Sequence, residues 1–170
     1  IANNVLAHVE HPAEFLAACR LLVEGAGGAA SGTGGGRIVF EVPWLGDLLD
    51  RLAYDTIYHE HQSYFSVSAL LRVAQAAGLV IDDIEHVPVH GGSLRVWASA
   101  RTGPRTHAAA AALWAENERA MGLAGPGSFE RLTRFAADVD RNRRELTALL
   151  KTLKQDGARI AACGAPAKST

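Results

Sequence analysis

The chain has 170 residues, of which 48% are hydrophobic and 21% charged, and its formal net charge is −1. This composition is typical of a globular protein with one good core and part of a second. The near-neutral charge lacks the basic excess of a non-specific phosphate-backbone binder, and no apolar run approaches the roughly 18 residues that span a bilayer. We therefore expect neither nucleic acid nor membrane as a partner.

The two cysteines, Cys19 and Cys163, lie far apart, and neither belongs to a CxxC pair. They indicate reduced, buried thiols in a cytoplasmic protein and disfavour a zinc site built from this segment. The chain opens with IANNVLAH, without Met, and closes with ARIAACGAPAKST, where an apolar run has just met a Gly/Pro turn. We expect an internal piece of a longer protein.

The first stretch of the chain predicts a strand and then a helix. Residues 1–6 fit the end of a buried strand. Pro12 can open a helix at its first turn, and apolar residues continue at helical spacing to Val23. The Gly-rich residues 25–36 lack the Lys-Ser/Thr ending of a phosphate loop and follow a helix rather than a strand, so a flexible surface insertion is favoured.

The alternation continues to residue 100. Residues 37–43 predict a β-rich strand stopped by its final proline, and 44–52 have a helical pattern. Ser66 is a suitable N-cap for the next helix. Residues 79–89 and 93–100 predict two strands joined as a hairpin by the HGG turn.

The character of the chain changes near RTGPR, residues 101–105, where we place a domain boundary. A helix is predicted over 106–122, and GPGS at 125–128 breaks it. Apolar residues at helical spacing then mark a long amphipathic helix from Phe129 to Leu153. ARIAACGAPAK, 158–168, predicts a strand, a Gly turn and the start of another helix.

This order of elements indicates an α/β fold with a mainly parallel sheet, to which the terminal hairpin adds one antiparallel strand. Ligands in such folds bind beyond the carboxyl ends of the strands. Three polar clusters follow strand ends, which favours one shared cleft. They are Asn3-Asn4 with His8, the YHEH segment 58–61, and His90-Gly91-Gly92.

The segment YDTIYHEHQSYFS, 54–66, contains all three tyrosines of the chain and holds Tyr58, His59, Glu60 and His61 together. A histidine can accept a proton at neutral pH, a carboxylate can orient it, and a phenol can donate to an oxyanion. These are the groups that remove a proton next to a carbonyl. From the residues alone, a polar connection, a catalytic loop and a metal site all stay open, although HEH spacing suits a metal poorly.

HGGSLR, 90–95, permits close backbone approach to a ligand, but an ordinary hairpin turn explains it equally. His8 alone is more often a structural histidine than a catalytic one.

Five blocks of the sequence together carry a family resemblance: NNVLAHV, IVFEVPWLGDLL, DTIYHEHQSYFS, HVPVHGGSLRVW and CGAPAKST. They resemble the S-adenosylmethionine-dependent sugar C-methyltransferases, which act on nucleotide-linked 4-keto-deoxysugars in antibiotic and surface-polysaccharide biosynthesis. The resemblance runs nearly from end to end, and its YHEH and HGGSLR blocks are its most specific part.

The resemblance implies that residues 1–104 form the second half of a class I methyltransferase (Rossmann-like) sheet. Residues 1–6 would end its fourth strand, 37–42 would be its fifth, and 79–100 its terminal antiparallel hairpin. Residues 105–170 would begin a C-terminal α/β domain that helps to hold the nucleotide-sugar.

The resemblance also implies a reaction, in which a base takes the proton beside the C4 ketone and the enolate attacks the sulfonium methyl, without a metal. His61 is then the candidate base, with Glu60 its neighbour and Tyr58 in contact with the substrate or the enolate oxygen. Asn4 and His8 would line the reaction centre. By the same resemblance, Asn3 and Asn4 would bind the cofactor. The residues that would bind the substrate are His90, Ser93, Arg95, Gly164 and Lys168.

Several family features would lie before Ile1: the glycine-rich cofactor loop, the acidic residue for the ribose, and a cysteine-rich zinc module. AKST also replaces the more usual AKGNT ending. We therefore expect that these 170 residues alone neither bind S-adenosylmethionine tightly nor turn over.

Three alternatives remain. The same fold could methylate an oxygen or nitrogen of a small molecule, or it could be a non-catalytic nucleotide-sugar-binding module. A metal-dependent hydrolase is the most distant of the three. The nucleotide-linked sugar, with dTDP as the expected carrier, is the partner that the leading hypothesis predicts.

Overall fold

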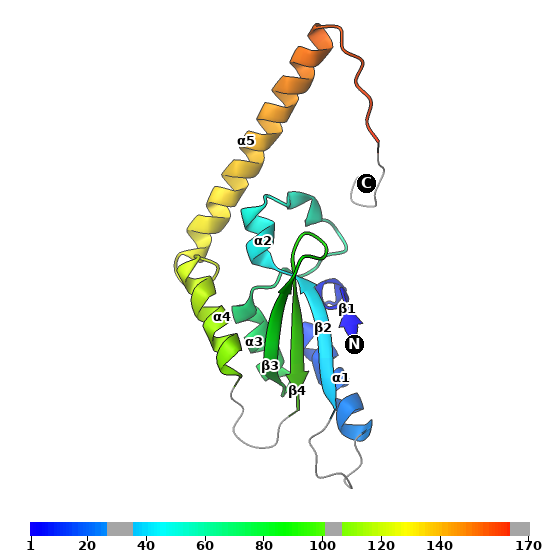
Figure 1. Cartoon of the computed structure of the whole chain (residues 1–170), viewed down its shortest axis with the longest axis vertical. Coiled ribbons are helices and arrows are strands. Elements are labelled where there is room, and N and C mark those ends of the chain that lie inside the picture. Colours follow the sequence, from blue (N-terminus) through cyan, green and yellow to red (C-terminus); the bar gives the residue numbers. More distant parts are fainter. Residues whose placement is uncertain (27–35, 101–106, 164–170) are drawn as a thin grey trace.

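The computed structural model describes residues 1–26, 36–100 and 107–163, which form a four-stranded sheet with helices packed against it (Figure 1). One long helix projects beyond the end of this body (Figure 1). The elements in chain order are β1 (Ala2–Asn3), η1 (Leu6–His8), α1 (Pro12–Ala26), β2 (Arg37–Pro43), α2 (Leu45–Asp50), η2 (Tyr54–Thr56), α3 (Val67–Ala76), β3 (Val80–Val87), β4 (Ser93–Ser99), α4 (Ala109–Ala120) and α5 (Ser128–Gln155).

The sheet has the strand order β1-β2-β4-β3. β1 pairs with β2 in parallel, whereas β4 is antiparallel to both of its neighbours. It follows that β1, β2 and β3 run in one direction and that β4 alone is reversed. The predicted α/β class, hairpin and single antiparallel strand are confirmed, and the return strand of the hairpin inserts between β2 and β3. The carboxyl ends of the three like-directed strands therefore share one edge.

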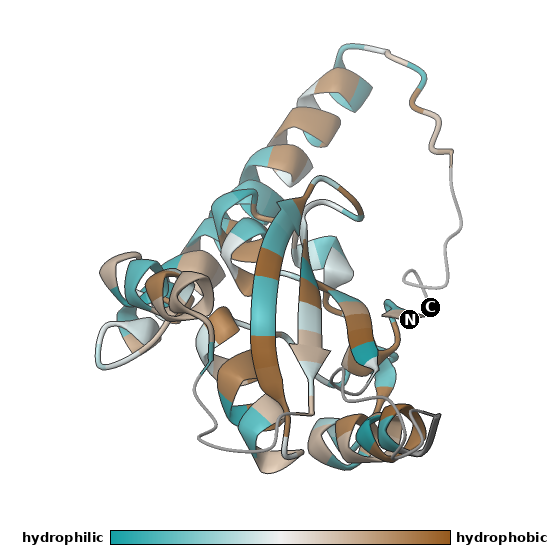
Figure 2. Cartoon of the chain, turned by 60° about the horizontal axis from the view of Figure 1, so that its bottom comes forward, coloured by the Kyte–Doolittle hydropathy of each residue, from teal (hydrophilic) through white to brown (hydrophobic). Residues whose placement is uncertain are grey.

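One face of this sheet forms the core. Alternate residues of β2 and β4 are buried there, and the alternation is visible as bands of hydropathy along the strands in Figure 2. Leu16 of α1 and Leu70 of α3 are fully buried against this face. The strand residues that it buries are Ile38, Phe40, Val42, Leu94, Val96 and Ala98.

Local signals in the sequence set the ends of α3. The Ser66 hydroxyl accepts a hydrogen bond from the Ala69 N–H at 3.1 Å, so the predicted N-cap is confirmed. Gly78 follows the helix with a φ of 75°, a conformation that favours glycine.

The structure corrects the predicted ends of the chain. The first strand is only Ala2–Asn3, because Asn4 has a φ of 54° and the chain then turns into η1. The strand predicted within 158–168 is absent from its described part: residues 158–163 have no regular secondary structure and are exposed. A strand needs a partner for its main-chain groups, and the described residues offer none there. Cys163 is exposed rather than buried, and Cys19 is half-buried.

Several predictions fall outside the described residues. They concern most of the Gly-rich insertion, the boundary at 101–105, and Gly164 and Lys168. Among the residues that the structure does describe, no helix is long and apolar enough to cross a membrane.

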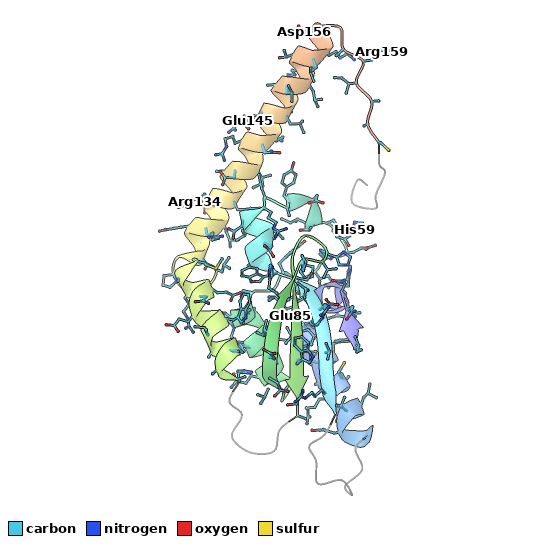
Figure 3. The ribbon with its side chains drawn as sticks, in the orientation of Figure 1. His59, Glu85, Arg134, Glu145, Asp156 and Arg159 are labelled. Atoms are coloured by element: carbon cyan, nitrogen blue, oxygen red, sulfur yellow. The ribbon has the colours of Figure 1, made fainter. Side chains whose placement is uncertain are left out.

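The long amphipathic helix is confirmed as α5, and none of its 28 residues is buried. Figure 3 shows Arg134 and Glu145 extending outward from it. The Arg131 guanidinium pairs with the Asp50 carboxylate, and the Tyr54 hydroxyl donates to Asn142 Oδ1 at 3.1 Å, so the first half of α5 contacts the region of α2 and η2. Its exposed large apolar side chains are Phe129, Leu132, Leu146, Leu149, Leu150 and Leu153.

The segment that begins α4 is bonded to the outer edge of β3. The Ile81 N–H donates to His107 Nδ1 at 3.0 Å, and the Ala108 N–H donates to the Ile81 carbonyl at 3.0 Å. Burial lowers the pKa of His107 below its usual range. Ala111 and Leu123 belong to the same core as the sheet, so α4 is packed into this body.

The bond from Ile81 predicts that acid weakens the fold. Protonation would place a donor where His107 Nδ1 now accepts, and the lowered pKa means that the unfolded chain protonates first. The contribution of His107 is therefore present above its unfolded pKa of about 6.5 and is lost as pH falls below it. Urea unfolding at pH 7.5 and pH 5.5 should show a smaller loss of stability in His107→Gln than in the wild type.

The matched control is His11→Gln, which changes a histidine whose side chain is 64% exposed. This variant should keep the pH dependence of the wild type. An unchanged pH dependence in His107→Gln would contradict the proposed origin of the acid sensitivity.

Candidate active site

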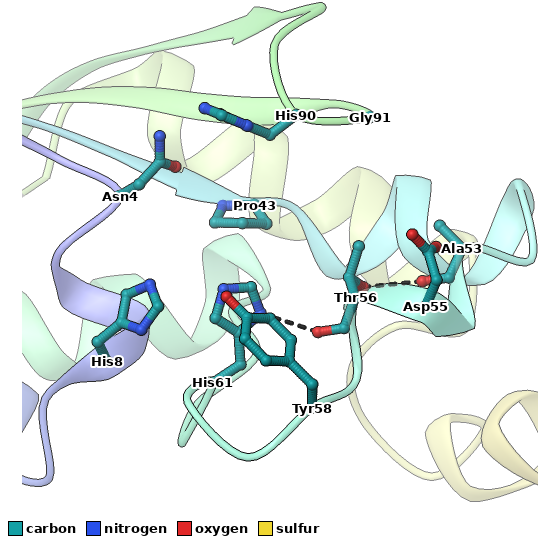
Figure 4. Close-up of a pocket in the computed structure, with 10 residues that line it drawn as sticks. All are labelled: Asn4, His8, Pro43, Ala53, Asp55, Thr56, Tyr58, His61, His90 and Gly91. Atoms are coloured by element: carbon teal, nitrogen blue, oxygen red, sulfur yellow. Dashed lines mark hydrogen bonds between the residues drawn. The ribbon is translucent and has the colours of Figure 1, made fainter. Parts of the chain in front are cut away.

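A cavity of about 400 Å³ lies at the edge where β1 and β2 end (Figure 4). Its volume is within the range of sites for small molecules. It is bordered by η1, the segment after α2 and the turn between β3 and β4. The lining residues are Asn4, His8, Pro43, Ala53, Asp55, Thr56, Tyr58, His61, His90 and Gly91.

Two of the lining residues have a backbone conformation that is uncommon outside glycine. Asn4 has a φ of 54° and His90 a φ of 51°. Such conformations cost on the order of 1–3 kcal/mol each and gather at functional sites. The Asn4 N–H donates to the Glu41 carbonyl at 3.0 Å, and Gly92 N–H donates to the Val89 carbonyl at 2.9 Å, so hydrogen bonds hold both turns.

Hydrogen bonds join the residues that follow the YHEH segment to η1. The N–H groups of Gln62 and Ser63 donate to the Ala7 carbonyl at 2.8 and 3.2 Å, and Gln62 Nε2 donates to the His8 carbonyl at 3.3 Å. These bonds bring His61 to His8, with ring centroids 4.8 Å apart and an edge-to-face arrangement. The strand-end clusters that the sequence predicts to share a cleft do meet at this cavity.

The main chain fixes the tautomer of His61. Its Nδ1 lies 2.9 Å from the Thr56 carbonyl oxygen, which can only accept (Figure 4). The neutral ring therefore carries its proton on Nδ1, and Nε2 is the nitrogen with the basic lone pair. The Tyr58 ring lies 4.4 Å from His61, centroid to centroid.

Glu60 is exposed and is not among the lining residues. The structure therefore does not show Glu60 orienting the histidine. The acceptor that orients His61 is instead the carbonyl of Thr56.

Asn4 presents an unsatisfied acceptor. Its side-chain oxygen is buried and has no hydrogen-bond partner among the described residues. Leaving a buried acceptor unpaired costs about 1–3 kcal/mol, so this oxygen suits a donor or cation of a ligand. Asn3, in contrast, is exposed at the end of β1 and does not line the cavity.

The Tyr64 ring also packs edge-to-face near His61, with ring centroids 6.0 Å apart. Burial raises the pKa of Tyr64 above its usual range. The phenol therefore stays protonated at neutral pH. Among the described residues, no group of three or more His, Cys, Asp or Glu side chains is arranged to hold a metal ion.

Comparison with known proteins shows the family of this chain. Residues 88–170 match the model of the C-methyltransferase C-terminal domain. The C-methyltransferase NovU of Streptomyces niveus is 34% identical over 135 residues, which cover 79% of this chain and 31% of that protein. This chain belongs to the C-methyltransferase family. It spans 31% of the length of this curated relative.

The cavity is lined by residues from both sides of position 88, where the match to the family model begins. The family model begins at residue 88, so the turn that carries His90 and Gly91 lies inside it. The lining residues from Asn4 to His61 precede it. The predicted boundary near 101–105 stays a prediction.

Only part of the HGGSLR motif faces the cavity. His90 and Gly91 line it, whereas Ser93 is buried and donates from its hydroxyl to the Val89 carbonyl at 2.9 Å. Arg95 is turned to the other face of the sheet, where it pairs with Glu41 at 3.1 Å and with Glu85 at 3.2 Å. Ser93 and Arg95 therefore support the turn and the sheet in this structure.

Sequence reasoning did not identify Pro43, Ala53, Asp55 and Thr56 as lining residues. Pro43 was interpreted only as the end of a strand. Thr56 acts through its main-chain oxygen, which no residue type reveals in advance.

The second glycine of the HGG turn is packed against a side chain. Gly91 and Gly92 have φ values of 86° and 120°. A Cβ at Gly92 would overlap the carboxylate of Asp47, which also pairs with His86, whereas a Cβ at Gly91 would meet nothing within 4 Å.

We expect Gly91→Ala to lower the free energy of unfolding by about 1 kcal/mol, through backbone strain alone. Gly92→Ala should cost at least about 2 kcal/mol more, because the Asp47 carboxylate must also move. Urea denaturation of the two variants measures the difference. Equal losses would show that the Asp47 contact does not constrain the turn.

Proposed function

We propose that the protein containing this chain is an S-adenosylmethionine-dependent C-methyltransferase that acts on a nucleotide-linked 4-keto-deoxysugar in the cytoplasm. The observation that carries the proposal is the placement of a tautomer-fixed His61 beside Tyr58 and His8 in one cavity. Family membership and the similarity to a C-methyltransferase support the reaction type.

In the proposed reaction, Nε2 of His61 takes the proton from the carbon next to the C4 ketone. The electron pair of that C–H bond moves toward the ketone oxygen and gives an enolate. Tyr58 and His8, whose rings lie 4.4 and 4.8 Å from the His61 ring, are close enough to border the same substrate oxygen. Donors at that position lower the barrier because they stabilise the charge that develops there.

The cofactor fit rests on Asn4. Its buried, unpaired side-chain oxygen suits a donor or the positive charge of S-adenosylmethionine. Bound S-adenosylmethionine supplies an electrophilic methyl group to the enolate carbon. Asn4 would hold the cofactor end of the cavity, with exposed Asn3 next to it.

The proposed sugar site is completed by His90 and Gly91, which line the cavity from the hairpin turn. Gly164 and Lys168 stay in the proposal as contacts to the nucleotide phosphates, where main-chain N–H groups and a cation suit the charge. Ser93 and Arg95 contribute through the turn and the sheet. Glu60 is a neighbour of the base rather than its orienting partner.

The test is His61→Asn in the complete protein, assayed with a sugar nucleotide deuterated beside the ketone. Loss of the base should reduce kcat by a factor on the order of 100 to 10,000, with little change in substrate affinity. The rate at which the substrate loses deuterium to water without methyl transfer should fall by a similar factor. The matched control is His59→Asn, which changes an exposed histidine of the same segment, located at the outer side of the loop (Figure 3).

Unchanged deuterium loss in His61→Asn would overturn the role of this residue as the base. Methyl transfer without any deuterium loss, in the wild type, would favour O- or N-methylation, because neither forms an enolate. Binding of the nucleotide-sugar without transfer of a methyl group would favour a binding module.

A further inference from the structure

Glu118 is a fully buried carboxylate that the proposed reaction does not use. It accepts a hydrogen bond from Trp44 Nε1 at 2.9 Å, and it accepts two more from the main-chain N–H groups of Val67 at 2.6 Å and Ser68 at 2.8 Å. All three partners are donors, which suits an ionised carboxylate because that group only accepts. The bonds to Val67 and Ser68 also place its negative charge at the N-terminus of α3, where the helix dipole favours it.

The three partners of Glu118 flank one connecting segment of the chain, residues 45–66, which we call the 45–66 excursion. Trp44 follows Pro43, the last residue of β2, and Val67 begins α3. The chain between them, residues 45–66, contributes five lining residues to the cavity. They are Ala53, Asp55, Thr56, Tyr58 and His61.

The ends of this excursion also contact each other directly. Trp44 and Phe65 form an isolated parallel bridge, and the Leu45 N–H donates to the Phe65 carbonyl at 2.9 Å. Glu118 reaches both ends at once and so closes the base of the excursion from a third element.

Helix α4, which carries Glu118, is packed firmly into the core. Ala115 and Ala111 are buried on the same helix face as Glu118, about one and two turns before it, respectively. The Leu123 N–H donates to the Glu118 carbonyl at 2.8 Å and ends the helix. The Trp114 ring packs edge-to-face on the Trp44 ring at 5.5 Å.

We propose that Glu118 is a positioning residue, which fixes both ends of the 45–66 excursion and thereby sets the placement of Tyr58 and His61 in the cavity. A helix of the region matched by the C-terminal family model thus helps to shape the proposed methyl-transfer site. The effect on turnover rests on the proposed function, whereas the effect on the excursion does not.

The test compares Glu118→Gln with Glu116→Gln in the complete protein. The second variant makes the same chemical change at an exposed position of the same helix. In Glu118→Gln the amide nitrogen faces N–H donors, so the base of the excursion should loosen. Hydrogen exchange at the His61 and Gln62 amides, which donate to Tyr58 and Ala7, should become about tenfold faster or more.

In the same variant kcat should fall by roughly 10- to 100-fold with a smaller change in KM, because the reacting groups are displaced while the rest of the cavity remains. Glu116→Gln should match the wild type in both measurements. Wild-type exchange in 54–64 for a folded Glu118→Gln would overturn the proposal, whatever the activity. Faster exchange with an inactive wild type would instead leave the positioning role standing and overturn the proposed function.

Trp44→Phe provides a second variant if Glu118→Gln does not fold. It removes the indole donor and leaves the bonds to α3 in place. Faster exchange at the Leu45 amide, with the Ala69 amide unchanged, is the expected result. Unchanged exchange at both amides would overturn the proposal.

Discussion

The cavity depends on the carbonyl oxygen of Ala7, which accepts the N–H groups of Gln62 and Ser63. This contact joins a short turn after β1 to a segment more than fifty positions later, and it places His61 against His8. It can form only because β1 and β2 are parallel neighbours, so that both chains leave the sheet at the same edge. The placement of His61 beside His8 follows from that shared edge.

Polar groups behind the cavity are used as supports. Asp47 contacts His86 and the underside of the HGG turn, and Glu118 contacts both ends of the 45–66 excursion. Burying such carboxylates is costly unless donors surround them, and both are supplied with donors. The residues that line the cavity are mainly histidine and tyrosine rings, the Asn4 amide and backbone turns, with Asp55 as the carboxylate among them. Asp47 and Glu118 are not lining residues and hold the surrounding segments in place.

The sequence predicts what depends on neighbours along the chain. Ser66 predicts the start of α3, alternating apolar residues predict β2 and β4, and the strand ends predict the edge at which the cavity lies. Contacts between distant positions are not encoded in this way. Trp44 and Glu118 are 74 residues apart, and the Thr56 carbonyl has no residue-type signature. The strand expected within 158–168 is absent from its described part, residues 158–163, because an apolar run alone does not provide a partner for the main chain of a strand.

The place of β4 has a consequence for how this protein is made. β2 and β3 run in the same direction and are separated by β4, so neither can satisfy the other's exposed main-chain edge. During synthesis the edges of β2 and β3 that face β4 stay unpaired until residues 93–99 have left the ribosome. The nascent chain therefore exposes the unpaired edges of two strands until the hairpin closes and β4 pairs with both.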